Sequence, residues 1–259
     1  MAKRKNEDRI TPEESRKMIC NNLSFAAAEA YKLLRTNVLF SLPGEDGCKV
    51  IGVTSALRGE GKSTTSINLA YTTALTGKKV LLLEADMRLP NIARRMDVAP
   101  RPGLSNLLVG QSRGGEVIQR SRQLDNLWII TAGDIPPNPA ELLGSRQMEI
   151  ALKSLGQSFD VIIVDLPPVT VVSDAVIVSR LVHGMVIVVR QDFCDKVALD
   201  ETVRQLRFAD TKILGFVMSG ADYQNKGYKR YGYGKGGKNS ASKYYGYGTQ
   251  PYSGKSPKA

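Results

Sequence analysis

The stretch VTSALRGEGKST, at residues 53–64, decides the fold of this 259-residue chain. It overlaps the end of a short apolar run, residues 49–54, and opens a segment with a helical pattern. Its spacing fits the phosphate-loop pattern G-x-x-x-x-G-K-[ST], except that Ala56 stands where the first glycine is usual. Gly59 and Gly61 allow the backbone to turn so that successive N–H groups point inward at phosphate oxygens. We therefore predict a phosphate-binding loop between a strand and a helix.

The side chains of this loop indicate which ligand it binds. Lys62 is placed to reach the β- and γ-phosphates of a nucleotide, and the Ser63 hydroxyl can ligate Mg²⁺. The helix that follows presents its N-terminal dipole to the same anion. A glycine turn with a chance lysine is the alternative, but the strand before it and the helix after it favour a site for ATP and Mg²⁺. The predicted nucleotide-binding residues are Arg58, Gly59, Glu60, Gly61, Lys62, Ser63 and Thr64.

Two further apolar runs end in acidic residues. The run VIIVD ends in Asp165, and the run VLLLE ends in Glu84, with Asp86 two positions later. The carboxyl ends of parallel strands face the ligand crevice of an open α/β sheet, and an i, i+2 spacing in extended chain puts Glu84 and Asp86 on one face. Alone, either set could be solvated strand-end acids. Beside a phosphate loop they predict a nucleotide–Mg²⁺ site, in which Ser63, Asp86 and Asp165 hold the metal.

Six short runs rich in Val, Ile and Leu recur along the chain, with helical patterns among them. Each run is continuous rather than alternating in polarity, as in strands buried on both faces of a parallel sheet. A buried helix is an alternative for any one run, but strand–helix alternation along the whole chain favours right-handed crossovers. We predict an α/β P-loop NTPase fold with a doubly wound, mostly parallel sheet flanked by helices. The strands are expected near residues 49–54, 79–84, 127–131, 160–165, 184–190 and 213–218, and helices near 25–41, 63–76 and 142–156.

The chain divides by composition into three segments. Residues 1–24 are polar and are expected to be flexible, and residues 25–222 supply one P-loop domain. Residues 223–259 consist largely of Gly, Tyr, Lys, Asn and Ser without apolar periodicity. Because such a segment buries too little apolar surface to offset its ordering entropy, it is expected to be disordered.

The last segment concentrates both charge and tyrosine. It carries eight basic residues and no acid, which is +8 of the net charge of +11, so the rest of the chain is near neutral. It also carries eight of the ten tyrosines. Interleaved basic and aromatic residues could form a nucleic-acid-binding arm, but no nucleic-acid-reading fold accompanies them. We therefore expect no specific nucleic-acid partner.

Several classes of protein are disfavoured by the composition. No run of about 18 apolar residues is present, so no membrane-spanning helix is expected. The N-terminus, MAKRKNEDRI, lacks the apolar stretch of a secretory signal. Cys20, Cys48 and Cys194 are scattered and, with the single His183, form no zinc-ligand spacing. They are typical of unpaired thiols in a reducing compartment.

The motifs together resemble those of one family. The stretches ALRGEGKST, LLLEADMRLP and FDVIIVDLPP are similar to the Walker A, Walker A′ and Walker B motifs of the bacterial tyrosine kinases, the cytoplasmic kinases of capsular and exopolysaccharide biosynthesis. EAYKLLRTN, GDIPPNPAELL and SDAVIVSRLVHGMVIVVR also match, and a tyrosine cluster closes the chain. The resemblance covers about residues 25–220 and the character of the tail.

The resemblance implies an ATP-dependent protein-tyrosine kinase that phosphorylates its own C-terminal tyrosines. Lys62, Glu84, Asp86 and Asp165 would be its catalytic residues. Glu84 would orient or deprotonate the phenol, while Asp86 and Asp165 would support Mg²⁺ together with Ser63. The expected phosphoacceptors are Tyr223, Tyr228, Tyr231, Tyr233, Tyr244, Tyr245, Tyr247 and Tyr252.

The resemblance also implies partners and a location. A separate membrane-spanning activator, a polysaccharide co-polymerase, would hold the kinase at the cytoplasmic face of the plasma membrane, and a cognate tyrosine phosphatase would reverse its action. In the family an E-x-x-R-x-x-R helix helps assemble a homo-oligomeric ring. That segment is Glu29, Lys32 and Arg35 in this chain. Lys32 keeps the charge of the usual arginine but loses its bidentate pairing.

Two departures from the family pattern, at Glu84 and Ser219, and one rival class of protein need to be considered. Glu84 stands where the family usually has Asp, and the extra methylene moves the carboxylate by about 1.5 Å, so a pseudokinase is one alternative. A switch ATPase of the partition or septum-positioning class is another. Those proteins carry a signature lysine early in the loop, where this chain has Leu57, and Arg58 just after it is a poor substitute. Leu57 and the tyrosine-rich tail argue against this alternative. Ser219 replaces an asparagine that the family often places near the adenine.

Overall fold

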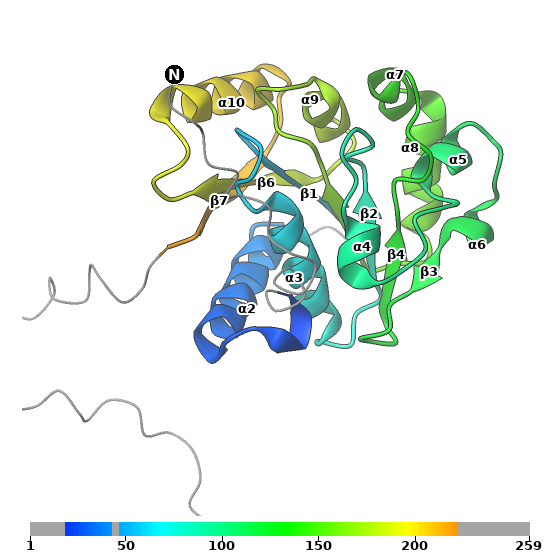
Figure 1. Cartoon of the computed structure of the whole chain (residues 1–259), viewed down its shortest axis with the longest axis horizontal. Helices are drawn as coiled ribbons and strands as arrows, with labels where there is room; N and C mark the ends of the chain where they lie inside the picture. Colours follow the sequence, from blue (N-terminus) through cyan, green and yellow to red (C-terminus); the bar gives the residue numbers. More distant parts are fainter. Residues whose placement is uncertain (1–18, 43–46, 222–259) are drawn as a thin grey trace, which may run out of the picture. The chain divides into compact units, whose positions relative to one another are not determined.

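The computed structural model describes residues 19–42 and 47–221, and within them seven strands form one sheet with helices on both faces (Figure 1). The strand order is β3-β4-β2-β5-β1-β6-β7. All neighbouring strands run parallel except β3 and β4, so the predicted doubly wound, mostly parallel sheet is confirmed. The strands are β1 (Lys49–Ser55), β2 (Val80–Glu84), β3 (Gln119–Arg120), β4 (Leu127–Ile130), β5 (Val161–Asp165), β6 (Gly184–Arg190) and β7 (Ile213–Ser219).

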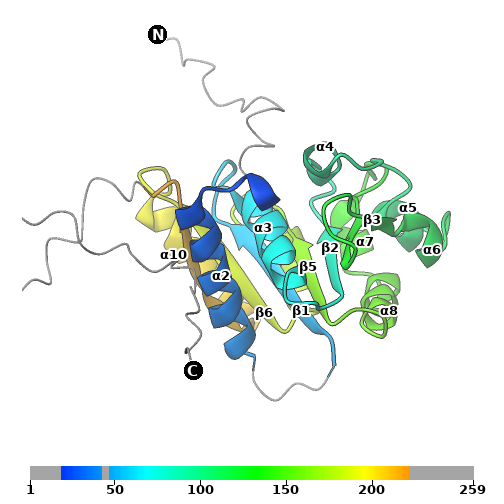
Figure 2. The same ribbon diagram turned by 90° about the horizontal axis from the view of Figure 1, so that it is seen from below.

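The helices form two layers, one on each face of the sheet. Figure 2 looks onto the face that α2 and α3 cover. Short helices, which the sequence patterns do not predict, follow β2 and fill the chain between β2 and β4. The helices are η1 (Cys20–Asn22), α2 (Phe25–Phe40), α3 (Lys62–Ala74), α4 (Ile92–Met96), α5 (Leu104–Leu108), α6 (Gly114–Val117), α7 (Pro139–Leu143), α8 (Arg146–Leu155), α9 (Asp174–Ser179) and α10 (Lys196–Phe208).

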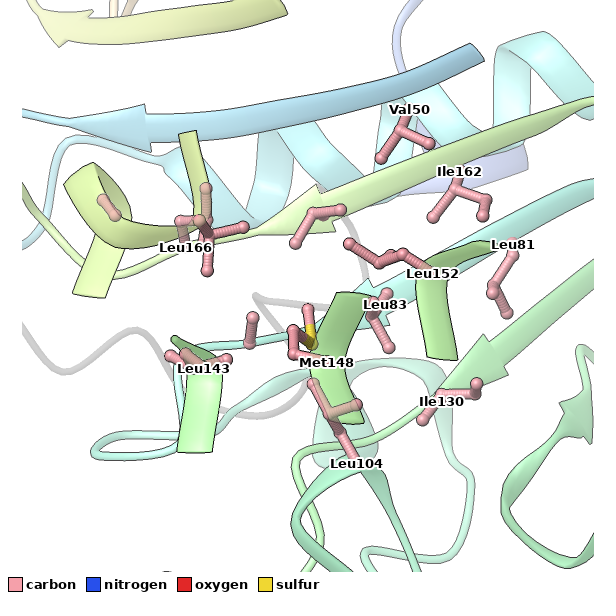
Figure 3. Close-up of a cluster of buried hydrophobic side chains, with 14 of the residues drawn as sticks. Val50, Leu81, Leu83, Leu104, Ile130, Leu143, Met148, Leu152, Ile162 and Leu166 are labelled. Atoms are coloured by element: carbon pink, nitrogen blue, oxygen red, sulfur yellow. The ribbon is translucent and has the colours of Figure 1, made fainter. Parts of the chain in front are cut away.

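Alternate residues of each buried strand enter opposite layers of the core, because side chains point to opposite faces along a strand. Leu83 of β2 belongs to the cluster that contains Met148 and Leu152 of α8 (Figure 3). Its neighbour Leu82 belongs to the cluster on the other face, with Ile67 of α3. This two-sided burial explains why the strand sequences are apolar throughout rather than alternating.

Two segments differ from the sequence prediction. The predicted helix over residues 142–156 is confirmed as α8 only from Arg146 to Leu155. Before it, α7 ends at Leu143, and α8 begins after Ser145, whose hydroxyl accepts the N–H of Met148 at 3.3 Å. Serine is a strong N-cap, so it starts a new helix here. The sequence also places residues 19–24 in the flexible N-terminus, whereas Ile19 and Cys20 are buried. The Cys20 N–H donates to Asn68 Oδ1 at 2.8 Å, which fastens this segment to α3.

The strand register brings the predicted site residues together. β5 lies between β1 and β2, and Asp165 at its end pairs with Glu84 on one side and with Val53 on the other. The loop that leaves β1 and the acids that end β2 and β5 therefore meet at one edge of the sheet. This is the carboxyl edge, where ligands of open α/β sheets bind.

Candidate active site

The loop between β1 and α3 has the backbone conformation that its glycines predict. Gly59 and Gly61 have φ angles of 86° and 93°, in the left-handed region that favours glycine. Glu60 lies between them, and its carboxylate accepts the N–H of Leu57 at 2.6 Å and that of Arg190 at 3.2 Å. The side chain of Glu60 therefore stabilises the loop, and only its backbone remains as the predicted contact with a nucleotide.

Two side chains at the ends of β6 and β7 support the same loop. Ser219, at the end of β7, donates its hydroxyl to the Glu60 carbonyl at 2.5 Å, and it faces Gly61 across the loop. Arg190, at the end of β6, donates from Nη1 to the Gly59 carbonyl at 3.3 Å and lies over the ring of Phe193, 5.2 Å from its centroid. Both side chains brace the loop backbone in this structure.

Lys62 begins α3 and forms the charged centre of the site. Its Nζ lies 2.7 Å from Asp86 Oδ2, and both side chains are largely buried. Burial by itself lowers the pKa of Lys62, but the nearby carboxylates of Asp165 and Asp86 outweigh it, so the pKa is raised. Lys62 is therefore charged at neutral pH, and it connects the phosphate loop to the segment after β2.

Asp165 is completely buried at the end of β5. One oxygen, Oδ1, accepts the Ser66 hydroxyl at 2.9 Å, whereas Oδ2 has no hydrogen-bond partner within the part of the chain that the structure describes. Burial raises the pKa of Asp165, although Lys62 opposes the shift. A buried carboxylate oxygen with a spare lone pair is costly unless a cation or an ordered water reaches it.

Glu84 has different surroundings from Asp86. It is fully buried, and Oε1 accepts the N–H groups of Asn91 at 2.5 Å and Ile92 at 2.7 Å. Its Oε2 accepts the N–H of Ala132 at 3.2 Å. Burial raises the pKa of Glu84 to about 7, although the backbone donors oppose the shift. Glu84 thus holds the start of α4 against the end of β4, and this geometry does not favour the predicted contact with an incoming phenol.

Helix α4 carries two side chains to the first turn of α3, and the motifs did not predict either of them. Asn91, just before α4, donates from Nδ2 to Ser63 Oγ at 3.2 Å. Arg95, within α4, donates from Nη1 to Thr64 Oγ1 at 2.6 Å. The predicted metal ligand Ser63 therefore has a partner from the residue before α4, and the predicted phosphate contact Thr64 has one from α4 itself.

A cavity of about 130 Å³ opens beside these groups. Of the predicted residues, Arg58, Lys62 and Asp86 contribute to its wall, and Asn91 adds a polar group. Glu84 is not among its lining residues. The cavity is completed by Arg88 and Leu89 after β2 and by Pro167, Pro168, Val171 and Val172 after β5.

Arg88 joins the two walls of this cavity. Its guanidinium donates from Nε and Nη2 to the two carboxylate oxygens of Asp174, at 2.9 and 3.0 Å. Asp174 is fully buried at the start of α9, and Arg88 is partly exposed. A bidentate pair of this kind fixes orientation as well as distance, so it holds the segment after β2 against α9.

The other predicted site residues lie elsewhere. Glu29 and Lys32 form an exposed ion pair of 2.7 Å within α2. Arg35, on the same helix, donates from Nη1 to the Thr72 carbonyl of α3 at 2.9 Å. The eight tyrosines expected to accept phosphate lie outside the described residues. Within those residues, no helix has the length and apolar character needed to cross a bilayer.

Comparison with known proteins gives one consistent answer. Residues 48–206 match the AAA domain family. Tyrosine-protein kinase YwqD of Bacillus subtilis (strain 168) is 35% identical over 206 residues, which is 80% of this chain and 85% of that protein. The kinase domain of Escherichia coli tyrosine kinase ETK superposes with a TM-score of 0.74 at 31% identity, over 80% of each chain. The chimerical protein CapA2B2 gives 0.73 at 31% identity, over 79% of this chain and 88% of that one. The chain therefore belongs to the bacterial tyrosine kinase family.

Proposed function

We propose that this chain is an ATP-dependent protein-tyrosine kinase that phosphorylates tyrosines in its own C-terminal segment and serves capsular or exopolysaccharide synthesis. The observation that carries the proposal is the pairing of Lys62 with Asp86 at 2.7 Å on the wall of a cavity, beside the spare oxygen of Asp165. Family membership supports the reaction class. The tyrosine-rich tail supplies the substrate hydroxyls.

The donor set fits a nucleotide with Mg²⁺. Kinase sites usually hold Mg²⁺ through one or two carboxylates together with substrate phosphates, and Ser63, Asp86 and Asp165 are oxygen donors of that type. Asp165 Oδ2, buried without a partner in the described part of the chain, suits a cation or its water shell. When bound, Mg²⁺ would neutralise charge that develops on the phosphates. The backbone of the Gly59–Gly61 turn would cradle the phosphate chain.

The protein's part in the transfer is positioning and charge. A tyrosine phenol has a pKa of about 10 and is a weak nucleophile at neutral pH. The phenol oxygen attacks the γ-phosphorus of ATP as the bond from that phosphorus to the β,γ-bridging oxygen breaks, and this oxygen leaves with ADP. The proton of the phenol passes to a nearby carboxylate. Lys62 stabilises the charge on the transferred group.

Of the two acids at and after the end of β2, Asp86 rather than Glu84 is the carboxylate that an incoming phenol can meet. It lines the cavity, whereas Glu84 is buried among three backbone N–H groups. In this proposal Glu84 positions the site instead of touching substrate. The proposal also removes the main difficulty that the extra methylene of Glu84 presents, because the longer side chain is not required to reach the phenol.

Family membership also supports a proposal about the wider assembly. We propose that a separate membrane-spanning activator brings the kinase to the inner face of the plasma membrane, and that a tyrosine phosphatase opposes it. A homo-oligomeric ring through α2 is part of the same proposal. Glu29 and Lys32 are exposed on that helix and available to a neighbour, whereas Arg35 already bonds to the Thr72 carbonyl.

The decisive experiment is incubation of the purified chain with ATP and Mg²⁺, followed by mapping of phosphotyrosine by mass spectrometry. We expect phosphate on the tail tyrosines of the wild type and on those of Lys78→Met, since Lys78 is an exposed lysine after α3. Lys62→Met should abolish it. If the wild type binds ATP but gains no phosphotyrosine, even with the cytosolic segment of an activator, the pseudokinase alternative holds instead.

A further inference from the structure

Two adjacent arginines in α4 have opposite surroundings. Arg94 is exposed, whereas Arg95 is largely withdrawn from solvent, and its Nη1 donates to Thr64 Oγ1 at 2.6 Å. The Nε of Arg95 is buried and has no hydrogen-bond partner within the described residues. The guanidinium of Arg95 is therefore held beside the first turn of α3 with part of its donor capacity unused.

The charge of Arg95 also lacks a direct counterion. No carboxylate of the described residues forms an ion pair with it, although Asp165 and Glu84 act on it from farther away. Burial lowers the pKa of Arg95, although Asp165 and Glu84 oppose the shift. A buried cation is retained at a cost unless an anion pairs with it.

Arg95 does not line the cavity itself, but its bond to Thr64 places it beside the predicted phosphate loop. Thr64 is the third residue of α3, and the first four N–H groups of a helix lack intrahelical partners and attract negative charge. Asn91 reaches Ser63 from the same side. Glu84 holds the backbone of Asn91 and Ile92, so the placement of Arg95 is built into the fold at the start of α4.

We propose that Arg95 is a phosphate-binding residue of the nucleotide site, supplied by α4 and kept in place by Glu84. Its ligand is the phosphate chain of a nucleoside di- or triphosphate. A guanidinium offers a planar set of donors that matches phosphate oxygens, which a lysine does not. The inference rests on the proposed function and adds to it a cation from outside the Walker motifs.

The test compares nucleotide affinity and stability in Arg95→Met, with Arg94→Met as the matched control. Affinity is measured by calorimetry with ADP and with β,γ-imido-ATP in Mg²⁺, and stability by the thermal midpoint without nucleotide. We expect Arg95→Met to weaken both nucleotides about tenfold or more, because it removes a charge-assisted hydrogen bond. The nucleotide-free midpoint should be unchanged or raised, since an uncompensated buried charge is removed. Arg94→Met should match the wild type in both measurements.

The outcomes separate this inference from the proposed function. If the wild type itself binds no nucleotide, the proposed function fails. If the wild type binds and Arg95→Met binds equally well, only the role of Arg95 is refuted, and its bond to Thr64 is a packing contact. If Arg95→Met also lowers the thermal midpoint, Arg95→Lys is measured in the same way. A partial recovery of nucleotide affinity in Arg95→Lys supports the proposal. A recovery of the midpoint without any recovery of affinity contradicts it.

Discussion

Glu84 ends β2 and Asp86 lies two positions later, and their carboxylates have different hydrogen-bond partners. The extended spacing predicts that both face the ligand crevice. In the structure Asp86 bonds to Lys62 on the cavity wall, while Glu84 binds three backbone N–H groups. The longer side chain reaches the start of α4, and this contact withdraws it from solvent. The hydrogen-bond partners of each carboxylate, rather than its position in the motif, therefore determine whether it can face a ligand.

The pKa of Glu84 gives a prediction at the residue scale. Because the pKa rises from 4.5 in the unfolded chain to about 7 in the folded one, the folded state holds the extra proton between these values. The free energy of unfolding should therefore fall as pH rises from about 5 to 7, with up to about 3 kcal/mol from this group.

The measurement is urea unfolding of the nucleotide-free chain at several pH values, with Glu84→Gln beside the wild type. Glu84→Gln should lose the part of the pH dependence of the unfolding free energy that Glu84 causes. The part caused by Asp165, whose pKa is also raised, should remain in both proteins. An identical pH dependence in the two proteins would show that Glu84 does not titrate in this range.

At the scale of elements, the site depends on segments that connect strands. The loop after β2 carries Asp86, the loop after β5 carries Pro167 and Pro168, and both form the cavity wall. The pair between Arg88 and Asp174 is the direct bond from the first of these segments to α9. Its bidentate geometry restricts how far the two walls can separate.

Removing the Asp174 charge should therefore loosen the cavity. Asp174→Asn should lower the free energy of unfolding by about 2 kcal/mol, because the variant weakens a buried charge-assisted bond while Arg88 is only partly desolvated. It should also raise the KM for ATP. The control is Glu149→Gln, which removes an exposed pair with Lys153 and should leave the free energy of unfolding nearly unchanged. Equal losses in the two variants would argue against a structural role for the Arg88 pair.

At the scale of the whole molecule, the folded unit and the tyrosine-rich segment are separable in sequence. The compact unit that contains every described element ends at Ala221. The eight predicted phosphoacceptors begin at Tyr223. Catalysis and substrate would therefore occupy different parts of one chain, which lets the tail of one copy serve the site of the same copy or of another.

A chain that ends at Ala221 tests this division. It should keep the thermal midpoint of the full chain and its stabilisation by nucleotide, since ligand that binds only the folded state stabilises by mass action. It should gain almost no phosphotyrosine, because only Tyr31 and Tyr71 remain. Added as enzyme to a full-length Lys62→Met chain, it should phosphorylate that tail. Stoichiometric phosphate on the truncated chain itself would move the acceptor site into the folded unit.

The sequence by itself determined the sheet, the phosphate loop and the acids at the strand ends. These features rest on local patterns: continuous apolar runs, glycines in a left-handed turn, and a lysine at the start of a helix. Only the tertiary structure decided that Glu84 is an anchor, that Arg88 pairs with Asp174, and that Arg95 rather than Arg94 turns inward. Each of these depends on contacts between segments distant in the chain, and on the rotation of a five-residue helix too short to show a period of its own.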